Sequence, residues 1–194
     1  MTGFTLMNGT NWPSGGRSGN GGGVFCQSTN ALVLNCLVIS NFAEYGGGAY
    51  SGTLTNCTLT GNKCTRGSGY GGGAYESVLN NCLLDYNVAT NYGGGANGCI
   101  LNNCFLNNNT ANAGGGAASG TMINCTVSNN VALPIGISPQ FTGNGGGAYN
   151  CSMLNCLIIS NSARYSLAPY SSGGGAYCGE FGEVVSNCVF RGNW

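Results

Sequence analysis

One phrase, repeated seven times, constrains the fold of this chain more than any other feature. In residues 71–87 it reads GGGAYESVLNNCLLDYN: three glycines, a small residue and an aromatic residue, then an Asn-Cys pair and a second Asn. A repeat of about 20–50 residues is typical of a stacked array rather than of a single irregular fold. The glycine triplets begin at Gly21, Gly46, Gly71, Gly93, Gly114, Gly145 and Gly173.

Three further positions of the phrase keep their residue type in every copy, which indicates columns of identical side chains. The Cys column is Cys36, Cys57, Cys82, Cys104, Cys125, Cys156 and Cys188. The Asn directly before each Cys is Asn35, Asn56, Asn81, Asn103, Asn124, Asn155 or Asn187. The second Asn, five residues after each Cys, is Asn41, Asn62, Asn87, Asn109, Asn130, Asn161 or Asn193.

The repeat length decides the fold class. The shortest period runs from Gly93 to Gly114, 21 residues later, and it leaves room for three short strands separated by bends but for no helix. We therefore predict an all-β chain, residues 1–194, that forms one right-handed parallel β-helix of about seven to eight rungs. Rungs should stack about 4.8 Å apart. The first rung, residues 3–20, is partial, and the others start at the triplets.

Alternation along each strand predicts which side chains fill the core. Ala74, Cys82 and Leu84 are expected to face inward, and Tyr75 and Leu83 to face outward. The inward aliphatic column is Val38, Leu59, Leu84, Leu106, Val127, Ile158 and Phe190.

The two Asn columns are expected to act as structural ladders. Asn tolerates the left-handed conformation that bends require, and its amide can bond the same amide one rung away. We expect the first column to face inward, so that Asn56 and Asn124 are inaccessible. Both ladders would fix the register of the stacked rungs.

The phrase resembles a known group of repeats. Gly-Gly-Ala with a following apolar residue, and an apolar residue three before Asn, is similar to the repeats of polymorphic outer-membrane proteins and of other bacterial right-handed β-helix proteins. The full Gly-Gly-Gly-Ala-Tyr form ends at Tyr50, Tyr75, Tyr149 and Tyr177. The resemblance covers about residues 3–194 and implies secreted or surface-displayed passengers, often adhesive, with no shared catalytic residues.

The charged residues are too few and too scattered for most chemistry. The chain has five basic residues, five acidic residues and no His, which excludes a basic nucleic-acid face and the usual His-containing triads and zinc sites. Parallel β-helices also include polysaccharide lyases and hydrolases, which need clustered carboxylates. The acids here are Glu44, Glu76, Asp85, Glu180 and Glu183. We expect no enzyme activity, no metal and no cofactor.

The twelve cysteines leave three interpretations open. Buried Cys packs as a small apolar residue, which we favour for the Cys column and for Cys64. Disulfides between some column cysteines and the additional Cys26, Cys99, Cys151 and Cys178 are the second interpretation. A row of metal-bound thiolates is the third, although no tetrahedral ligand spacing supports it.

Two groups of aromatic residues are candidate contacts for a ligand or partner. The first, Phe141, Tyr165 and Tyr170, lies in long insertions after the second Asn; the second is the outward column Tyr50, Tyr75, Tyr149 and Tyr177. Aromatic faces suit sugar rings, but stacking of the four tyrosines on one another would explain the column equally simply.

These features predict a non-catalytic structural or adhesive β-solenoid, extracellular or at a cell surface. Self-association through the solenoid ends would form filaments, and a glycan or cell-surface molecule is the other partner that we expect. The alternative is a carbohydrate-binding or pectate-lyase-like β-helix. No export signal or transmembrane stretch is recognisable, and we expect the chain to be an excerpt from a longer protein.

Overall fold

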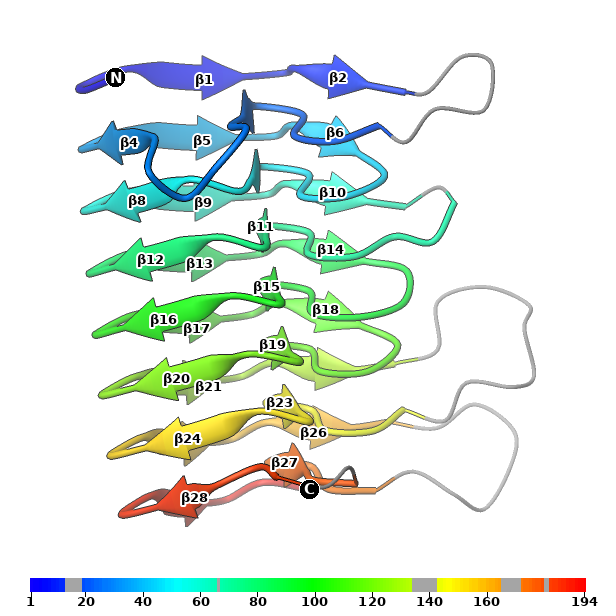
Figure 1. The fold of residues 1–194 in the computed structure, drawn as a ribbon. Coiled ribbons are helices and arrows are strands. Elements are labelled where there is room, and N and C mark those ends of the chain that lie inside the picture. Colours follow the sequence, from blue (N-terminus) through cyan, green and yellow to red (C-terminus); the bar gives the residue numbers. More distant parts are fainter. Residues whose placement is uncertain (13–18, 66, 134–142, 165–171, 180–181) are drawn as a thin grey trace.

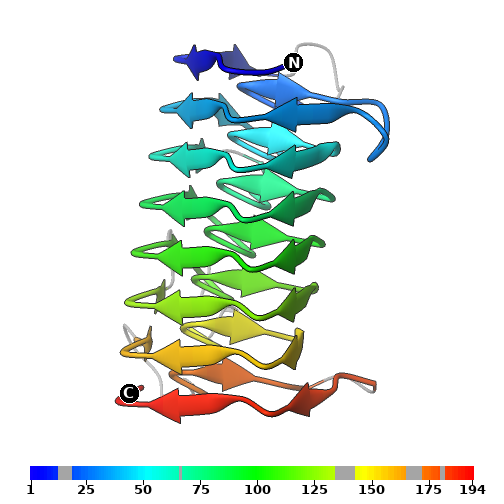
Figure 2. The ribbon, with the colours of Figure 1, turned by 90° about the vertical axis from the view of Figure 1, so that its left-hand side faces the viewer.

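The computed structural model describes residues 1–12, 19–65, 67–133, 143–164, 172–179 and 182–194, and it forms a parallel β-helix (Figure 1). Successive rungs stack along one axis from the N-terminal to the C-terminal end (Figure 2). The described residues contain strands, turns and bends, and none of their segments is a helix that could cross a membrane. The predicted fold class is confirmed.

Two sheets contain the strands between the triplet and the Asn-Cys pair. One has the order β27 (Ala176–Tyr177), β23 (Ala148–Tyr149), β19 (Ala117–Ala118), β15 (Ala96–Asn97), β11 (Ala74–Tyr75), β7 (Ala49–Tyr50) and β3 (Val24–Phe25). The other has the order β28 (Val185–Ser186), β24 (Ser152–Leu154), β20 (Thr121–Ile123), β16 (Ile100–Asn102), β12 (Val78–Asn80), β8 (Thr53–Thr55) and β4 (Leu32–Leu34).

Two more sheets contain the strands after the Cys. The eight-stranded sheet has the order β1 (Thr5–Met7), β5 (Leu37–Ile39), β9 (Thr58–Thr60), β13 (Leu83–Asp85), β17 (Phe105–Asn107), β21 (Thr126–Ser128), β25 (Leu157–Ile159) and β29 (Val189–Arg191). The last has the order β2 (Thr10–Asn11), β6 (Phe42–Ala43), β10 (Lys63–Cys64), β14 (Val88–Ala89), β18 (Thr110–Ala111), β22 (Val131–Ala132) and β26 (Ser162–Ala163).

Each complete rung therefore has four short strands, and the prediction of three was wrong. The rung that starts at Gly71 explains the difference, because four of its residues have positive φ. They are Gly71 (64°), Glu76 (48°), Asn81 (53°) and Tyr86 (52°). Each left-handed residue turns the chain, and the turn at Tyr86 separates β13 from β14. The turn is hard to predict from the repeated phrase because its residue type changes from rung to rung, for example from Gly61 to Tyr86 to Asn108.

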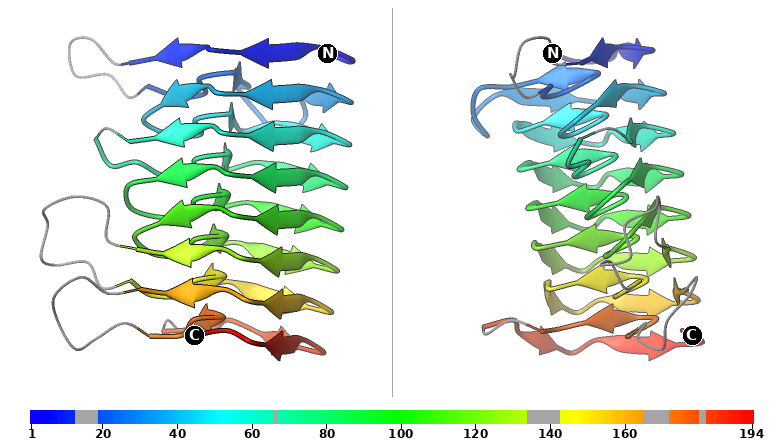
Figure 3. Two further views of the ribbon diagram at one scale, coloured as in Figure 1. Left: turned by 180° about the vertical axis from the view of Figure 1, so that it is seen from behind. Right: turned by 90° about the vertical axis from the view of Figure 1, so that its right-hand side faces the viewer.

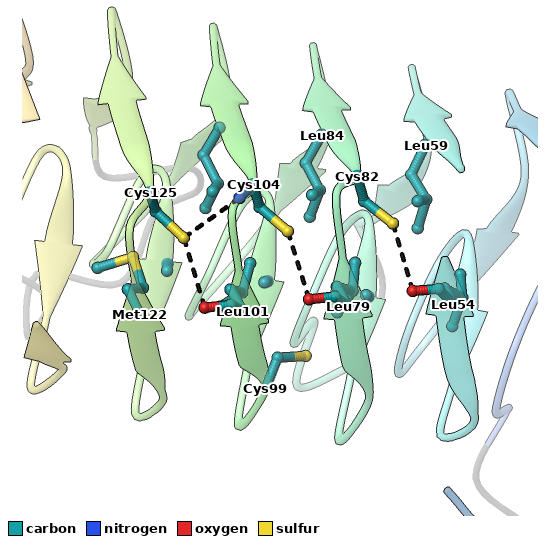
Figure 4. Close-up of a cluster of buried hydrophobic side chains, with 14 of the residues drawn as sticks. Leu54, Leu59, Leu79, Cys82, Leu84, Cys99, Leu101, Cys104, Met122 and Cys125 are labelled. Carbon is teal, nitrogen blue, oxygen red and sulfur yellow. Dashed lines mark hydrogen bonds between the residues drawn. The ribbon is translucent and has the colours of Figure 1, made fainter. Parts of the chain in front are cut away.

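The core is a column of apolar side chains between the sheets (Figure 4). Ala74, Leu79 and Leu84 are fully buried and Cys82 is 2% exposed, whereas Leu83 is 38% exposed. The predicted alternation is confirmed at these positions. The aliphatic column is buried from Val38 to Ile158, and its last member, Phe190, is 45% exposed on the final rung.

The second Asn column forms a continuous buried ladder. Asn87 Nδ2 donates to Asn109 Oδ1 at 3.0 Å and to the Leu59 carbonyl oxygen at 2.9 Å. The backbone N–H of Asn87 also donates to Asn109 Oδ1, at 2.9 Å. The same side-chain bond joins Asn41, Asn62, Asn87, Asn109, Asn130, Asn161 and Asn193 in turn.

The first Asn column lies outside the core, so its predicted inward orientation was wrong. Asn56 and Asn124 are exposed, with φ of 52° and 53°. Some of these amides still bond along the axis: Asn56 Nδ2 donates to Asn35 Oδ1 at 3.3 Å, and Asn124 Nδ2 to Asn103 Oδ1 at 3.2 Å. The main role of this column is to supply left-handed turns, because Asn accepts that conformation more readily than other non-glycine residues.

Candidate ligand-contact surface

The predicted tyrosine column lies on one outer edge of the solenoid, beside the glycine triplets. Tyr50, Tyr75, Tyr149 and Tyr177 occupy equivalent positions of paired strands and are partly exposed. Their stacking on one another is confirmed. The rings of Tyr50 and Tyr75 lie 5.5 Å apart at 24°, and those of Tyr149 and Tyr177 lie 5.3 Å apart at 5°.

A second tyrosine column, which the sequence analysis missed, runs alongside the first. Tyr45, Tyr70 and Tyr92 are joined by parallel bridges, and successive rings stack with centroids 5.5 Å apart. Their common signal is that each stands directly before a triplet, as in Tyr45-Gly46. The two columns touch, because the ring of Tyr45 meets the ring of Tyr75 edge to face at 5.3 Å and 66°.

The two tyrosine columns together form one aromatic strip along the solenoid. This strip continues across a rung that has no tyrosine. On that rung the two column positions are Ala113 and Ala118, which are 5% and 1% exposed. Tyr92 and Tyr149, from the rungs on either side, have ring centroids only 5.5 Å apart. The small alanines therefore let the flanking rings close over the gap, and the strip spans most of the solenoid.

Stacking limits what the tyrosines offer to a ligand. A ring between two stacked neighbours has both faces covered, so its edge and hydroxyl are what remain for solvent. Sugar rings bind to aromatic faces, and this surface therefore provides little area of the kind that a polysaccharide needs.

Glu76 modifies the strip where the two columns touch. Tyr50 donates its hydroxyl proton to Glu76 Oε2 at 3.3 Å. Burial, together with the Glu76 carboxylate, raises the pKa of Tyr75 to about 12 and also raises the pKa of Tyr50. Both phenols are therefore neutral over the physiological pH range.

We expect Tyr75 to ionise later than an ordinary tyrosine in an alkaline titration followed by phenolate absorbance. Tyr75→Phe should remove the component near pH 12, and Glu76→Gln should move it to lower pH. Because the folded pKa lies above the unfolded value, the folded chain holds this proton more tightly, so its contribution to stability is lost as pH rises from about 10 to 12. A titration unchanged by Glu76→Gln would contradict the assigned cause.

Phe141, Tyr165 and Tyr170, the other candidate contacts, lie outside the described residues. The strands that precede these two insertions in the sequence, β22 and β26, are neighbours in one sheet.

Large apolar side chains are exposed on two other faces. In the eight-stranded sheet, Leu83, Phe105 and Leu157 are 38%, 57% and 37% exposed. In the adjoining sheet of β12, Ile100 and Leu154 are 47% and 42% exposed. These positions are the outward residues of their strands, on either side of the turn formed by the exposed Asn column. The strands that carry them stack rung upon rung along the axis (Figure 3). Apolar patches of this kind commonly mark interaction sites.

The cysteines are thiols in this structure, and ten of the twelve are buried. In the Cys column, the backbone N–H of Cys104 donates to Cys125 Sγ at 3.4 Å, and Cys125 Sγ donates to the Leu101 carbonyl oxygen at 3.4 Å (Figure 4). Outside that column, burial raises the pKa of Cys64, Cys99 and Cys151 to about 12. Such thiols are protonated and unreactive at neutral pH.

The described acidic residues are dispersed. Glu76 lies at the turn after β11 and Asp85 lies in β13, on a different face of the solenoid. Glu180 lies outside the described residues. Within the part of the chain that the structure describes, no three His, Cys, Asp or Glu side chains are grouped so that they could hold a metal ion.

Comparison with protein-family models, with curated proteins and with solved structures finds no match to this chain. Inferences about function therefore depend on the geometry alone.

Proposed function

We propose that this chain is a non-catalytic structural and adhesive β-solenoid that acts outside the cell or at its surface. The observation that carries the proposal is the exposure of Leu83, Phe105 and Leu157 on one long face, beside Ile100 and Leu154 on the next. A surface of only ten charged residues offers little repulsion to an approaching partner. The buried Asn ladder keeps these faces rigid and regularly spaced.

Adhesion through these faces can be tested by coating beads with the protein and measuring retention on cell layers and on surfaces coated with the same protein. Phe105→Ser with Leu157→Ser should reduce retention severalfold, because both side chains are exposed and contribute apolar contact area. Thr126→Ser, on the same face and strand position between them, is the matched control. Equal retention of all three proteins would refute the proposed contact surface.

End-to-end association is the second part of the proposal. The backbone of the terminal strands can pair with a further rung, which makes such a contact open-ended. Gly9 stands at the ladder position of the first rung and donates its N–H to Asn41 Oδ1 at 2.8 Å, so an end-to-end contact would rely on backbone pairing without a continuous Asn ladder. Negative-stain electron microscopy over a concentration series tests this. Filaments with an axial repeat of about 35–40 Å support it, and monomers at every concentration refute it.

The alternative, a carbohydrate-binding or pectate-lyase-like β-helix, receives less support. Stacked tyrosines cover one another's faces, and Glu76 and Asp85 lie on different faces. Release of unsaturated products from polyuronates in the presence of Ca²⁺ would overturn the non-catalytic assignment.

A further inference from the structure

The outer face of the eight-stranded sheet carries two opposite charges that are placed symmetrically. Each of its strands has three described residues, of which the first and the third point outward. Among these outward residues, Asp85 and Arg191 are the only charged ones. Both are third residues, of β13 and β29, and these two strands lie two places from β21 on opposite sides of it. The strand β21 is therefore the midpoint between the two charges.

The exposed apolar residues of the same face are arranged around the same midpoint. The paired first positions of the five strands from β13 to β29 are, in order, Leu83, Phe105, Thr126, Leu157 and Val189. The four apolar side chains are 37–57% exposed. The two strands next to β21 thus both carry a large apolar side chain, and so do the two strands beyond them, while the smaller Thr126 stands at the centre.

Two copies related by a twofold axis can pack these faces together in two ways. An axis parallel to the solenoid directs both copies the same way and places the first residue of each strand over the third residue of the same strand. Leu83 would then face Asp85 of the other copy, and Phe105 would face Asn107. An axis along a strand makes the copies antiparallel and keeps first residues over first residues. The antiparallel arrangement is favoured, because burial of a charge against an apolar side chain is costly.

We propose that this face pairs with the same face of a second copy of the chain, in the antiparallel arrangement with the axis along β21. Strands equally far from β21 then face each other. Phe105 of each copy packs against Leu157 of the other, and Leu83 packs against Val189. The central Thr126 meets its own counterpart, where two large side chains would collide.

The charges select this register among the antiparallel ones. With the axis along β21, Asp85 of each copy faces Arg191 of the other, so that the dimer contains this ion pair twice. An axis between β17 and β21 would place Asp85 opposite Ile159 instead. Asp85 Oδ1 accepts hydrogen bonds from Asn107 Nδ2 and Asn108 Nδ2, both at 3.3 Å, which orient the carboxylate on the outer face.

The paired area predicts a weak contact. Five strands about 4.8 Å apart span about 20 Å, so each copy buries on the order of a few hundred Å², less than the roughly 800 Å² of a standard interface. We expect a Kd of about 0.1–1 mM at low salt. Weak contacts act together when many copies are displayed on two surfaces. The inference deepens the proposed function, on which it rests for its biological role, by naming a second copy as the partner of this face.

Sedimentation equilibrium of the full chain, at concentrations up to about 1 mM, tests the pairing. A face-to-face contact is closed and gives dimers, whereas end contacts add further copies. We expect a monomer–dimer equilibrium that weakens severalfold in high salt, because the ion pairs lie near the rim of a small interface. Monomers at every concentration would overturn the proposal, and so would association that Asp85→Arg leaves unchanged.

Exchange of the two charges tests the register. Asp85→Arg places two arginines opposite each other twice in the dimer, and Arg191→Asp does the same with two aspartates, so each should weaken pairing at least about tenfold. The chain with both substitutions is the matched control and should pair as the unmodified chain does. An equimolar mixture of the two single variants should also pair normally, because opposite charges again face each other at both places. A mixture as weak as the single variants would refute the register. Circular dichroism checks that every variant is folded.

The bead assay separates this pairing from the adhesive function. Beads that carry Asp85→Arg should be retained poorly on a surface coated with the same variant and normally on one coated with Arg191→Asp. A chain that forms the dimer but is retained on no surface would refute the adhesive function and keep the pairing. A chain that is retained on cell layers but stays monomeric would refute the pairing and keep the adhesive function.

Discussion

Replacing Asn109 with Ala should destabilise the solenoid by about 3 kcal/mol or more. Asn109 Oδ1 accepts two bonds from Asn87, one from its backbone N–H and one from its Nδ2, and Asn109 Nδ2 donates to the Leu84 carbonyl oxygen at 2.9 Å and to Asn130 Oδ1 at 3.0 Å. The substitution removes one hydrogen bond from each of four buried groups: the Asn87 N–H, Asn87 Nδ2, the Leu84 carbonyl oxygen and Asn130 Oδ1. Each such group costs about 1–3 kcal/mol.

Asn103→Ala on the same rung is the matched control. Asn103 is exposed and has φ of 53°, so its replacement places Ala in the left-handed region at a cost of about 1–2 kcal/mol. Urea denaturation at equal protein concentration gives both values. If Asn109→Ala lowers the free energy of unfolding no more than Asn103→Ala does, the hydrogen bonds of the buried amides contribute little to stability.

The contrast between the two Asn columns shows where sequence reasoning succeeded and where it failed. The repeat length and the alternation around Cys82 placed Leu84 inside and Leu83 outside, as the structure does. The same alternation, applied strictly, puts Asn81 outside because it directly precedes Cys82, so the prediction of an inward first column did not follow from it. It fails for Asn87, because the positive φ of Tyr86 shifts the phase and turns the next side chain inward. Since Asn suits both a left-handed turn and a buried ladder, residue type alone does not separate the two roles.

The candidate contact surface was predictable only in part. Tyr75 belongs to the repeated phrase, so its column could be read directly from the spacing. Tyr45, Tyr70 and Tyr92 lie at the ends of insertions of variable length. The only sequence feature that they share is their position directly before a glycine triplet.

Gly72→Ala should be among the most destabilising substitutions in the chain and should lower the free energy of unfolding by at least about 4 kcal/mol. Gly72 is the second glycine of its triplet, and a Cβ there would lie 2.5 Å from the Gly94 carbonyl oxygen and 2.6 Å from that of Val88. Both obstacles are backbone atoms, and the Gly94 oxygen accepts the N–H of Gly73 at 3.1 Å. Making room for a methyl group therefore breaks pairing between rungs. Losses of this size arise from a few mechanisms, of which forced overpacking is one.

Gly61→Ala separates lack of space from backbone strain. Gly61 has φ of +64°, and the nearest atom to a Cβ there is Ser40 Oγ at 3.6 Å, so the substitution introduces strain without a collision and should cost about 1–2 kcal/mol. Guanidinium denaturation of the two variants measures the difference, and a Gly72→Ala chain that does not fold agrees with the expectation only if Gly61→Ala folds. Similar losses of stability at both positions would contradict the collision as the cause, because Gly72 itself does not have a positive φ. We expect Gly72→Ala to lower stability more than Gly61→Ala. This result would show that the second glycine is required because neighbouring rungs approach closely there, and the short repeat leaves the rungs no room to move apart.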